Sequence, residues 1–177
     1  MIPRDEAIVS DSMMQYFEAA PQENMLDALK NSTKQFKKLL RKIPKKKIDY
    51  AYAEGKWTIR EVLQHIIDAE RVFSFRALWF SRHDVSPLPA FDENSWAASS
   101  KADARRWKDL VEEFLTLRAA NQMFFESLDD EQLKAVGTAN NKQMNPAGLG
   151  FVSAGHVMHH IRIIKERYLA KKQPIDL

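Results

Sequence analysis

The sequence predicts an all-α protein, a four-helix bundle with a long connection between its second and third helices. Only 5 Gly and 7 Pro occur among 177 residues, and these are the residue types that most disfavour helix interiors. Four segments of about twenty residues repeat apolar side chains at helical intervals. No strand-like alternation persists along the chain. The length fits one domain, residues 1–177, better than two.

The first long helix is expected at residues 23–43. Apolar side chains recur there at three- and four-residue intervals, and Pro44 ends the pattern because its ring cannot continue a helix. A short helix at residues 12–19 precedes it and stops before Pro21. The apolar residues of the long helix are Met25, Leu26, Leu29, Phe36, Leu39, Leu40 and Ile43.

The second long helix has the clearest start signal. Thr58 and Glu61 have the spacing of a capping box, in which the two side chains bind backbone N–H groups that the first turn leaves free. An apolar stripe runs from Ile59 to about Ser81, and the helix carries His65. Residues 83–99 then form a connection that contains Pro87 and Pro89. Its length predicts a crossover or a lid that packs on the bundle.

The third helix is expected to begin near Ser100, an N-cap with Asp103 three residues on. Its apolar residues follow the alternating three–four spacing of a bundle helix up to Leu128. Residues 127–132 predict a break and a short helical turn, and residues 137–146 a polar loop. The last helix covers roughly residues 150–170.

Composition excludes several classes of protein. Without cysteine there is no disulfide, no thiolate nucleophile and no iron–sulfur cluster, so a metal would have to be held by His, Asp or Glu. No apolar run reaches the roughly 18 residues of a membrane span. The N-terminus lacks the apolar stretch of a signal peptide, so a cytoplasmic location is expected.

The net charge of +3 is mild, and most of the excess lies between Lys34 and Lys47. Nucleic-acid binding would need stacking aromatics among these charges or a known reading motif. Only Phe36 and Tyr50 lie nearby, and Phe36 falls on the apolar face. We therefore expect a solvated helix face rather than a nucleic-acid or phosphate site.

Three of the five histidines fall within residues 156–160. His156 and His160 lie four residues apart, which places them on one helix face about 6 Å apart along the axis, within reach of one metal ion. His159 is an alternative ligand. His65 is the candidate third ligand because an inward-facing imidazole on another helix needs a partner. The zinc-protease signature is absent because Val157 follows His156, and His83 is expected at the surface.

The residues resemble the DinB/YfiT-like superfamily in three motifs, which lie in the family's order. They are Glu54–Arg71, Phe91–Ala97 and Gly155–His160. The resemblance covers nearly the whole chain and implies an up-up-down-down style bundle, often a homodimer. It also implies one divalent metal ion such as nickel, zinc, iron or manganese, held by His65, His156 and His160. His159 matches an additional histidine that many members carry, and we do not assign it to the metal.

The resemblance also implies a choice of functions. Some members are metal-dependent transferases that join a low-molecular-weight thiol such as bacillithiol to an electrophile, others isomerise maleylpyruvate with mycothiol, and others are described as hydrolases. We expect a metal-dependent enzyme acting on a small molecule, either a thiol-S-transferase or a hydrolase. A non-catalytic, stress-associated metal-binding bundle is the alternative.

Two acidic residues and two tryptophans near the motifs also have expected roles. Asp68 lies near the face of His65 and is a candidate hydrogen-bond partner for it, whereas Glu70 points about 140° away and is expected to serve a neighbouring helix or a dimer contact. For both residues an ordinary ion pair is at least an equal alternative. Trp57 and Trp96 are expected to be packing residues rather than substrate platforms.

Overall fold

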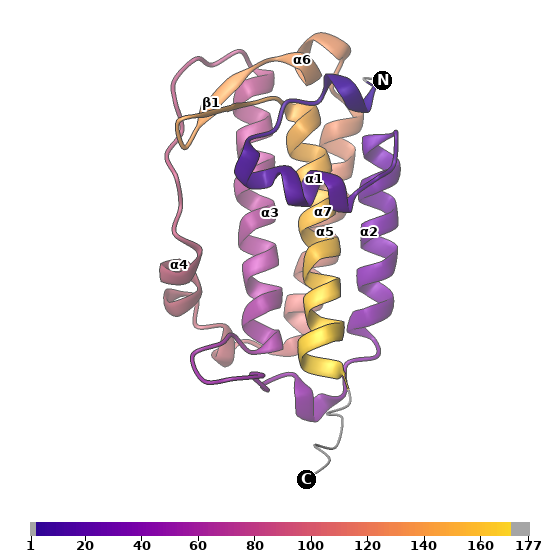
Figure 1. The fold of residues 1–177 in the computed structure, drawn as a ribbon, viewed down its shortest axis with the longest axis vertical. Coiled ribbons are helices and arrows are strands. Elements are labelled where there is room, and N and C mark those ends of the chain that lie inside the picture. Colours follow the sequence, from indigo (N-terminus) through magenta and orange to yellow (C-terminus); the bar gives the residue numbers. More distant parts are fainter. Residues whose placement is uncertain (1–2, 171–177) are drawn as a thin grey trace.

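The computed structural model describes residues 3–170, and it confirms the all-α four-helix bundle (Figure 1). The long helices are α2 (Met25–Leu40), α3 (Ile59–Ser81), α5 (Trp107–Glu126) and α7 (Pro146–Ile163), and a π-helical segment, Ile164–Leu169, continues α7. The shorter helices are α1 (Met14–Ala19), α4 (Glu93–Ser99) and α6 (Asp130–Lys134), with 3₁₀ turns at Arg4–Glu6, Asp11–Met13, Lys45–Lys47 and Ala102–Ala104. Within the described part of the chain, none of the helices combines the length and the apolar character needed to span a bilayer.

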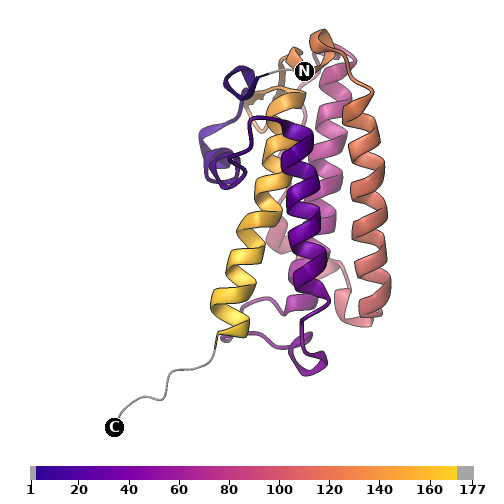
Figure 2. The ribbon, with the colours of Figure 1, turned by 90° about the vertical axis from the view of Figure 1, so that its right-hand side faces the viewer.

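The four long helices form a closed bundle in which α7 and α5 each pack against both α2 and α3. Figures 1 and 2 show that α2 and α7 run in one direction and α3 and α5 in the other. The expected up-up-down-down order is therefore wrong. The connection from α3 to α5 returns along the length of the bundle, so α5 starts at the same end as α3 and runs parallel to it.

The predicted starts of the first two long helices agree closely with the structure. The Thr58–Glu61 capping box is present, with the Thr58 hydroxyl accepting from the Glu61 N–H and the Glu61 carboxylate from the Thr58 N–H. Asn24 caps α2 by accepting from Leu26 N–H. This helix ends at Leu40, slightly before the predicted Ile43.

The start predicted for the third helix at Ser100 is wrong. The Ser100 hydroxyl donates to the Ala97 carbonyl at 2.8 Å, so Ser100 ends α4 instead of capping a new helix. Lys101 follows with a left-handed φ of 52°, and α5 begins only at Trp107. A hydroxyl residue suits either role, and the sequence spacing alone does not distinguish them.

The expected polar loop at residues 137–146 contains a small hairpin instead. Strands β1 (Gly137–Ala139) and β2 (Lys142–Met144) pair antiparallel, joined by Asn140 and Asn141 at φ of 50° and 55°. Two consecutive positive φ angles are typical of the tight hairpin turn that favours Asn. The hairpin also anchors the α3–α5 connection, because Leu88 N–H donates to Thr138 O at 2.9 Å. Helix α7 starts directly afterwards at Pro146, capped by Asn145 and earlier than predicted.

A polar layer divides the apolar core into two clusters along the bundle. Each long helix supplies a buried polar side chain to it, namely Ser32, Glu70, Arg118, and Ser153 with His156. Arg118 is fully buried and donates to Glu70 Oε2 at 2.7 Å, to Ser32 Oγ at 3.1 Å and to the backbone carbonyl oxygen of Ser153 at 3.2 Å. Buried polar groups require such partners. The layer therefore connects all four helices at the level of the histidines.

Candidate metal centre

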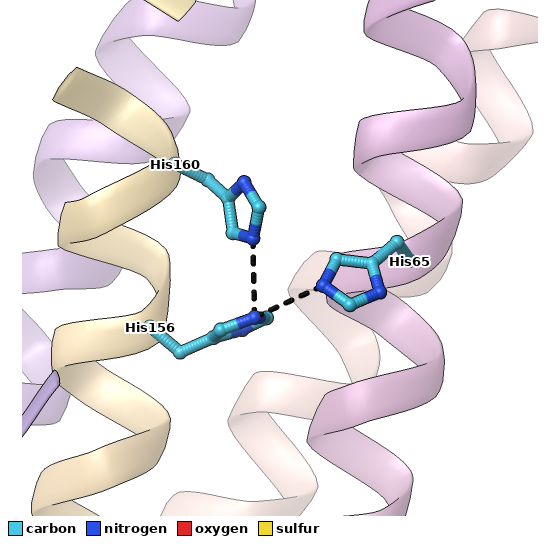
Figure 3. Close-up of side chains that lie close together, drawn as sticks. All are labelled: His65, His156 and His160. Atoms are coloured by element: carbon cyan, nitrogen blue, oxygen red, sulfur yellow. Dashed lines mark hydrogen bonds between the residues drawn. The ribbon is translucent and has the colours of Figure 1, made fainter. Parts of the chain in front are cut away.

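Three histidines from two helices converge on one point, as Figure 3 shows. His156 Nε2 lies 3.1 Å from His65 Nε2 and 3.1 Å from His160 Nε2. The three ring centroids are 4.5–5.1 Å apart. Among the described residues, these are the grouped side chains whose ligand atoms could share one metal ion, all within 4.8 Å of one another.

Helix α7 presents His156 and His160 to α3 because they lie one turn apart on its buried face. The preceding Gly155 permits a second close approach, from α1. A Cβ at residue 155 would lie 1.6 Å from the carbonyl oxygen of Tyr16. The absent side chain therefore lets α1 cross close to α7, and Figure 1 shows the two helices crossing. Tyr16 on α1 lies next to His156 at this crossing.

Burial keeps these imidazoles neutral. It lowers the pKa of His65 to about 4, with Glu93 acting in the opposite direction. The pKa values of His156 and His160 lie well below the ordinary value, first because of burial and then because of the neighbouring histidines. Neutral imidazole is the form that binds a metal.

The arrangement of the three Nε2 atoms fits a bound cation better than it fits a hydrogen-bonded cluster. His156 Nε2 faces two other Nε2 atoms, yet a neutral ring nitrogen carries either one hydrogen or one lone pair. A metal bound at about 2.0–2.1 Å in tetrahedral geometry would hold its nitrogens about 3.3 Å apart, close to the two observed separations. His160 Nδ1 is buried without a hydrogen-bond partner in the described residues, so no protein acceptor orients this ring.

Aromatic side chains surround the three histidines. The Trp57 ring lies 4.8 Å from the His65 ring, and the edges of Tyr16 and Phe73 approach His156 at 5.1 and 5.6 Å. Trp57 is thus a packing residue against a candidate ligand. Trp96 packs on Phe91 at 5.0 Å.

The three histidines line a cavity of about 350 Å³. Its walls come from α1, α3, α7, the α3–α5 connection and the hairpin, and they include Tyr16, Arg76 and Glu93. Burial and then the Glu93 carboxylate raise the pKa of Tyr16. A cavity of this size falls within the range of small-molecule sites, about 300–1,000 Å³.

Three further residues considered from the sequence, namely His83, Asp68 and His159, lie outside the cluster. His159 packs against Tyr16 at 5.3 Å and faces Arg162, and His83 is exposed beside Glu131, as predicted. Asp68 accepts from the Gln64 side chain at 2.9 Å rather than from His65. Of the alternatives expected for Asp68, the hydrogen bond to His65 is therefore not formed.

Glu70 serves a neighbouring helix, the first of the two roles expected for it. Its carboxylate accepts from Arg118 Nη2 at 2.7 Å and from Asn121 Nδ2 at 2.9 Å, both on α5. No local sequence pattern indicates Arg118 as its partner, because the two residues lie 48 positions apart. This buried pair holds α3 and α5 together, with Glu70 five residues after His65 on α3.

Three residues of the cavity were not predicted as site residues. Glu93 belongs to a motif that was recognised, but only through its resemblance to the family. Tyr16 and Arg76 carry no local signal, because one lies on a six-residue helix and the other lies in an ordinary apolar–polar stripe. Only the packing of distant segments brings them to the histidines.

A family model of the DinB superfamily matches residues 28–164. The chain belongs to the DinB superfamily. This match covers both helices that carry the three histidines, and it confirms the family that the sequence motifs indicated.

Two individual proteins are similar to this DinB superfamily chain. YfiT from Bacillus subtilis, described as a probable metal-dependent hydrolase with an unusual four-helix bundle topology, superposes with a TM-score of 0.71 at 18% identity over 90% of this chain and 87% of that one. At that identity the likeness shows the fold. A protein of Geobacillus kaustophilus (strain HTA426), provisionally named as a metal-dependent hydrolase, is 25% identical over 88 residues. The 88 matched residues are 50% of this chain. They span 49% of the relative, which is about half of its length.

Proposed function

We propose that His65, His156 and His160 hold one divalent metal ion and that the chain is a metal-dependent enzyme, most simply a hydrolase, acting on a small molecule. The observation that carries this proposal is the meeting of three Nε2 atoms at the wall of a cavity. Two relatives described as metal-dependent hydrolases support it.

An ion held by His65, His156 and His160 would supply Lewis acidity, which would polarise a substrate oxygen and favour deprotonation of water or of a thiol. The protein's own groups orient the ligands and handle protons. The Trp57 ring packs against the His65 ring at 4.8 Å. Tyr16, with its raised pKa, stays protonated at neutral pH and can donate a hydrogen bond into the cavity.

Glu93 is the candidate proton acceptor. It is an exposed carboxylate on α4 that lines the cavity. It partly opposes the lowering of the His65 pKa by burial, and it adds to the raising of the Tyr16 pKa by burial. Its position at the cavity rim lets it take a proton and release it to solvent. Glu93→Gln should leave metal binding intact and lower turnover by about 10²–10⁴-fold, the usual range for loss of a general base.

The test combines metal analysis with turnover. Wild-type protein should bind one equivalent of zinc or nickel and cleave activated esters or amides only when loaded. His156→Ala should lose both properties, whereas His159→Ala, an imidazole next to the cluster, should keep both. Turnover that requires an added thiol together with an epoxide would assign the thiol-S-transferase reaction instead. Metal binding with no turnover under either condition would favour the non-catalytic metal-binding bundle.

Several finer expectations remain part of this proposal. They are the identity of the ion among nickel, zinc, iron and manganese, a low-molecular-weight thiol as co-substrate, a homodimer and a cytoplasmic location. Triple-imidazole sites accept several metals, so metal analysis of protein purified without added metal is the direct measurement. Light scattering in solution tests the dimer.

A further inference from the structure

Among the residues that the structure describes, none gives the buried cation Arg76 a carboxylate partner. The residue is only 4% exposed, and its one hydrogen bond to the described residues is from Nη2 to the Pro89 carbonyl oxygen at 2.9 Å. The equally buried Arg118 pairs with Glu70. Burial lowers the pKa of Arg76, but a guanidinium stays charged at neutral pH. An unpaired buried charge is costly, so its retention calls for an explanation.

Arg76 lies on the same stripe of α3 as His65. The two residues are eleven positions apart, which corresponds to three helical turns plus about 20° of rotation and to about 16 Å along the helix axis. Ala69 and Phe73 lie between them at helical spacing, and all four residues line the cavity of the three histidines. Long side chains on a helix lean toward its N-terminus, which for Arg76 is the direction of His65. The cavity therefore has a candidate metal site and a free cation on one wall.

A second cavity meets the first at Arg76. It also measures about 350 Å³, and it shares Arg76, Ala90 and Phe91 with the first. Apolar side chains dominate its other walls, including Phe75, Leu88 and Trp96. Phe75 and Trp96 are 49% and 43% exposed. A molecule bound at Arg76 thus has apolar surface on one side and the histidines on the other.

We propose that Arg76 binds the acidic group of a small organic anion that also carries an apolar portion, and that this anion is the substrate class of the site. The planar guanidinium keeps unused N–H donors in a fork that matches carboxylate, sulfonate and phosphate oxygens. The apolar portion lies in the second cavity. The reacting group extends along Ala69 and Phe73 toward the histidines. That the anion is a substrate rests on the proposed function, whereas its binding to Arg76 does not.

A purely structural role for Arg76 makes different predictions. The bond to Pro89 O ties the α3–α5 connection to α3, and glutamine at residue 76 keeps an N–H donor but removes the positive charge. If this bond were the whole role of Arg76, Arg76→Gln would not change the preference for anions over uncharged ligands. Any loss of binding affinity would then be equal for charged and uncharged ligands.

Calorimetric titration of the metal-free protein tests the proposal, because anions then cannot bind to a metal. The probes are hexanoate, hexanesulfonate and hexyl phosphate, with hexan-1-ol as the uncharged match. At least one anion should bind wild-type protein about 10-fold or more tightly than hexan-1-ol. Arg76→Gln should abolish that preference and leave hexan-1-ol unchanged, and Arg76→Lys should retain part of it. Arg71→Gln is the matched control, because Arg71 lines the second cavity but pairs with Glu113 at 2.5 Å.

A second measurement does not depend on the folding of any variant. The ¹⁵N resonance of the Arg76 Nε–H group in wild-type protein should shift when the preferred anion is added, while the Arg71 resonance stays in place. Equal binding of all anions and hexan-1-ol, or an unmoved Arg76 resonance, overturns the proposal. Metal binding is measured separately. Anion binding without metal binding would refute only the proposed metal site, and the reverse result would refute only the role of Arg76.

Discussion

His65 and His156 are 91 positions apart in the chain, yet their Nε2 atoms lie 3.1 Å apart. They come from α3 and α7, two helices that pack directly against each other. The contact brings two imidazole nitrogens together. Hydrogen bonds cannot satisfy the Nε2 atoms of all three histidines at once.

Replacing His65 by alanine should remove metal-dependent stabilisation. If zinc binds the folded protein only, zinc at 100 times its dissociation constant should raise the free energy of unfolding by about 2.7 kcal/mol. His65→Ala should lose most of this increase, and His159→Ala should retain it. Chemical denaturation with and without zinc measures both. An equal zinc effect in wild type and His65→Ala would contradict the assignment of His65.

The metal-free protein should lose stability as the pH falls below about 6.5. Because the folded-state pKa of His65 is lowered to about 4 and those of His156 and His160 are lowered as well, the unfolded chain takes up protons that the folded one does not. The stabilisation is full above the unfolded-state pKa near 6.5. It decreases between pH 6.5 and 4. For His65 alone the loss is on the order of 3 kcal/mol.

Urea denaturation with a chelator, at several pH values between 7.5 and 4.5, measures this effect. His156→Phe should flatten the pH dependence, because it removes one buried imidazole. The exposed His83 provides the control, and His83→Gln should leave the curve unchanged. A flat wild-type curve down to pH 5 would contradict the prediction.

Breaking the buried pair of Glu70 and Arg118 should be strongly destabilising. Their side chains are 2% and 0% exposed and lie 2.7 Å apart. Glu70→Ala leaves a buried guanidinium without its carboxylate, which typically costs about 3–5 kcal/mol. Glu126→Ala removes the exposed partner of Lys30, 3.3 Å away, and should cost less than about 1 kcal/mol. Comparable losses in the two variants would argue against the polar layer as a structural element.

Gly155→Ala should destabilise the protein and disturb the candidate site, although alanine is the better helix former by about 1 kcal/mol. The new methyl group would meet the Tyr16 carbonyl oxygen at 1.6 Å, which forces α1 away from α7. Overpacking of this kind costs about 1–3 kcal/mol. Thermal unfolding measures the loss, and tyrosine resonances report whether Tyr16 leaves His156. A variant more stable than wild type would show that α1 adjusts freely.

The sequence predicted the local elements best where a side chain acts on its own helix. The Thr58–Glu61 capping box was correct because the two residues interact within one turn. The start of α5 was wrong because Ser100 can serve either end of a helix. The hairpin around Asn140 was missed because its two three-residue strands are too short to show an alternating pattern.

By itself, the sequence determined that the chain is helical, that no thiol is available to a metal, and that His156 and His160 share one helix face. These properties follow from composition and from the fixed geometry of one turn. The tertiary structure alone decided that Arg118 is the partner of Glu70, and that Tyr16, Arg76 and Glu93 share a cavity with the three histidines. Such meetings depend on the direction and packing of whole helices, which the spacing of residues along one helix does not encode.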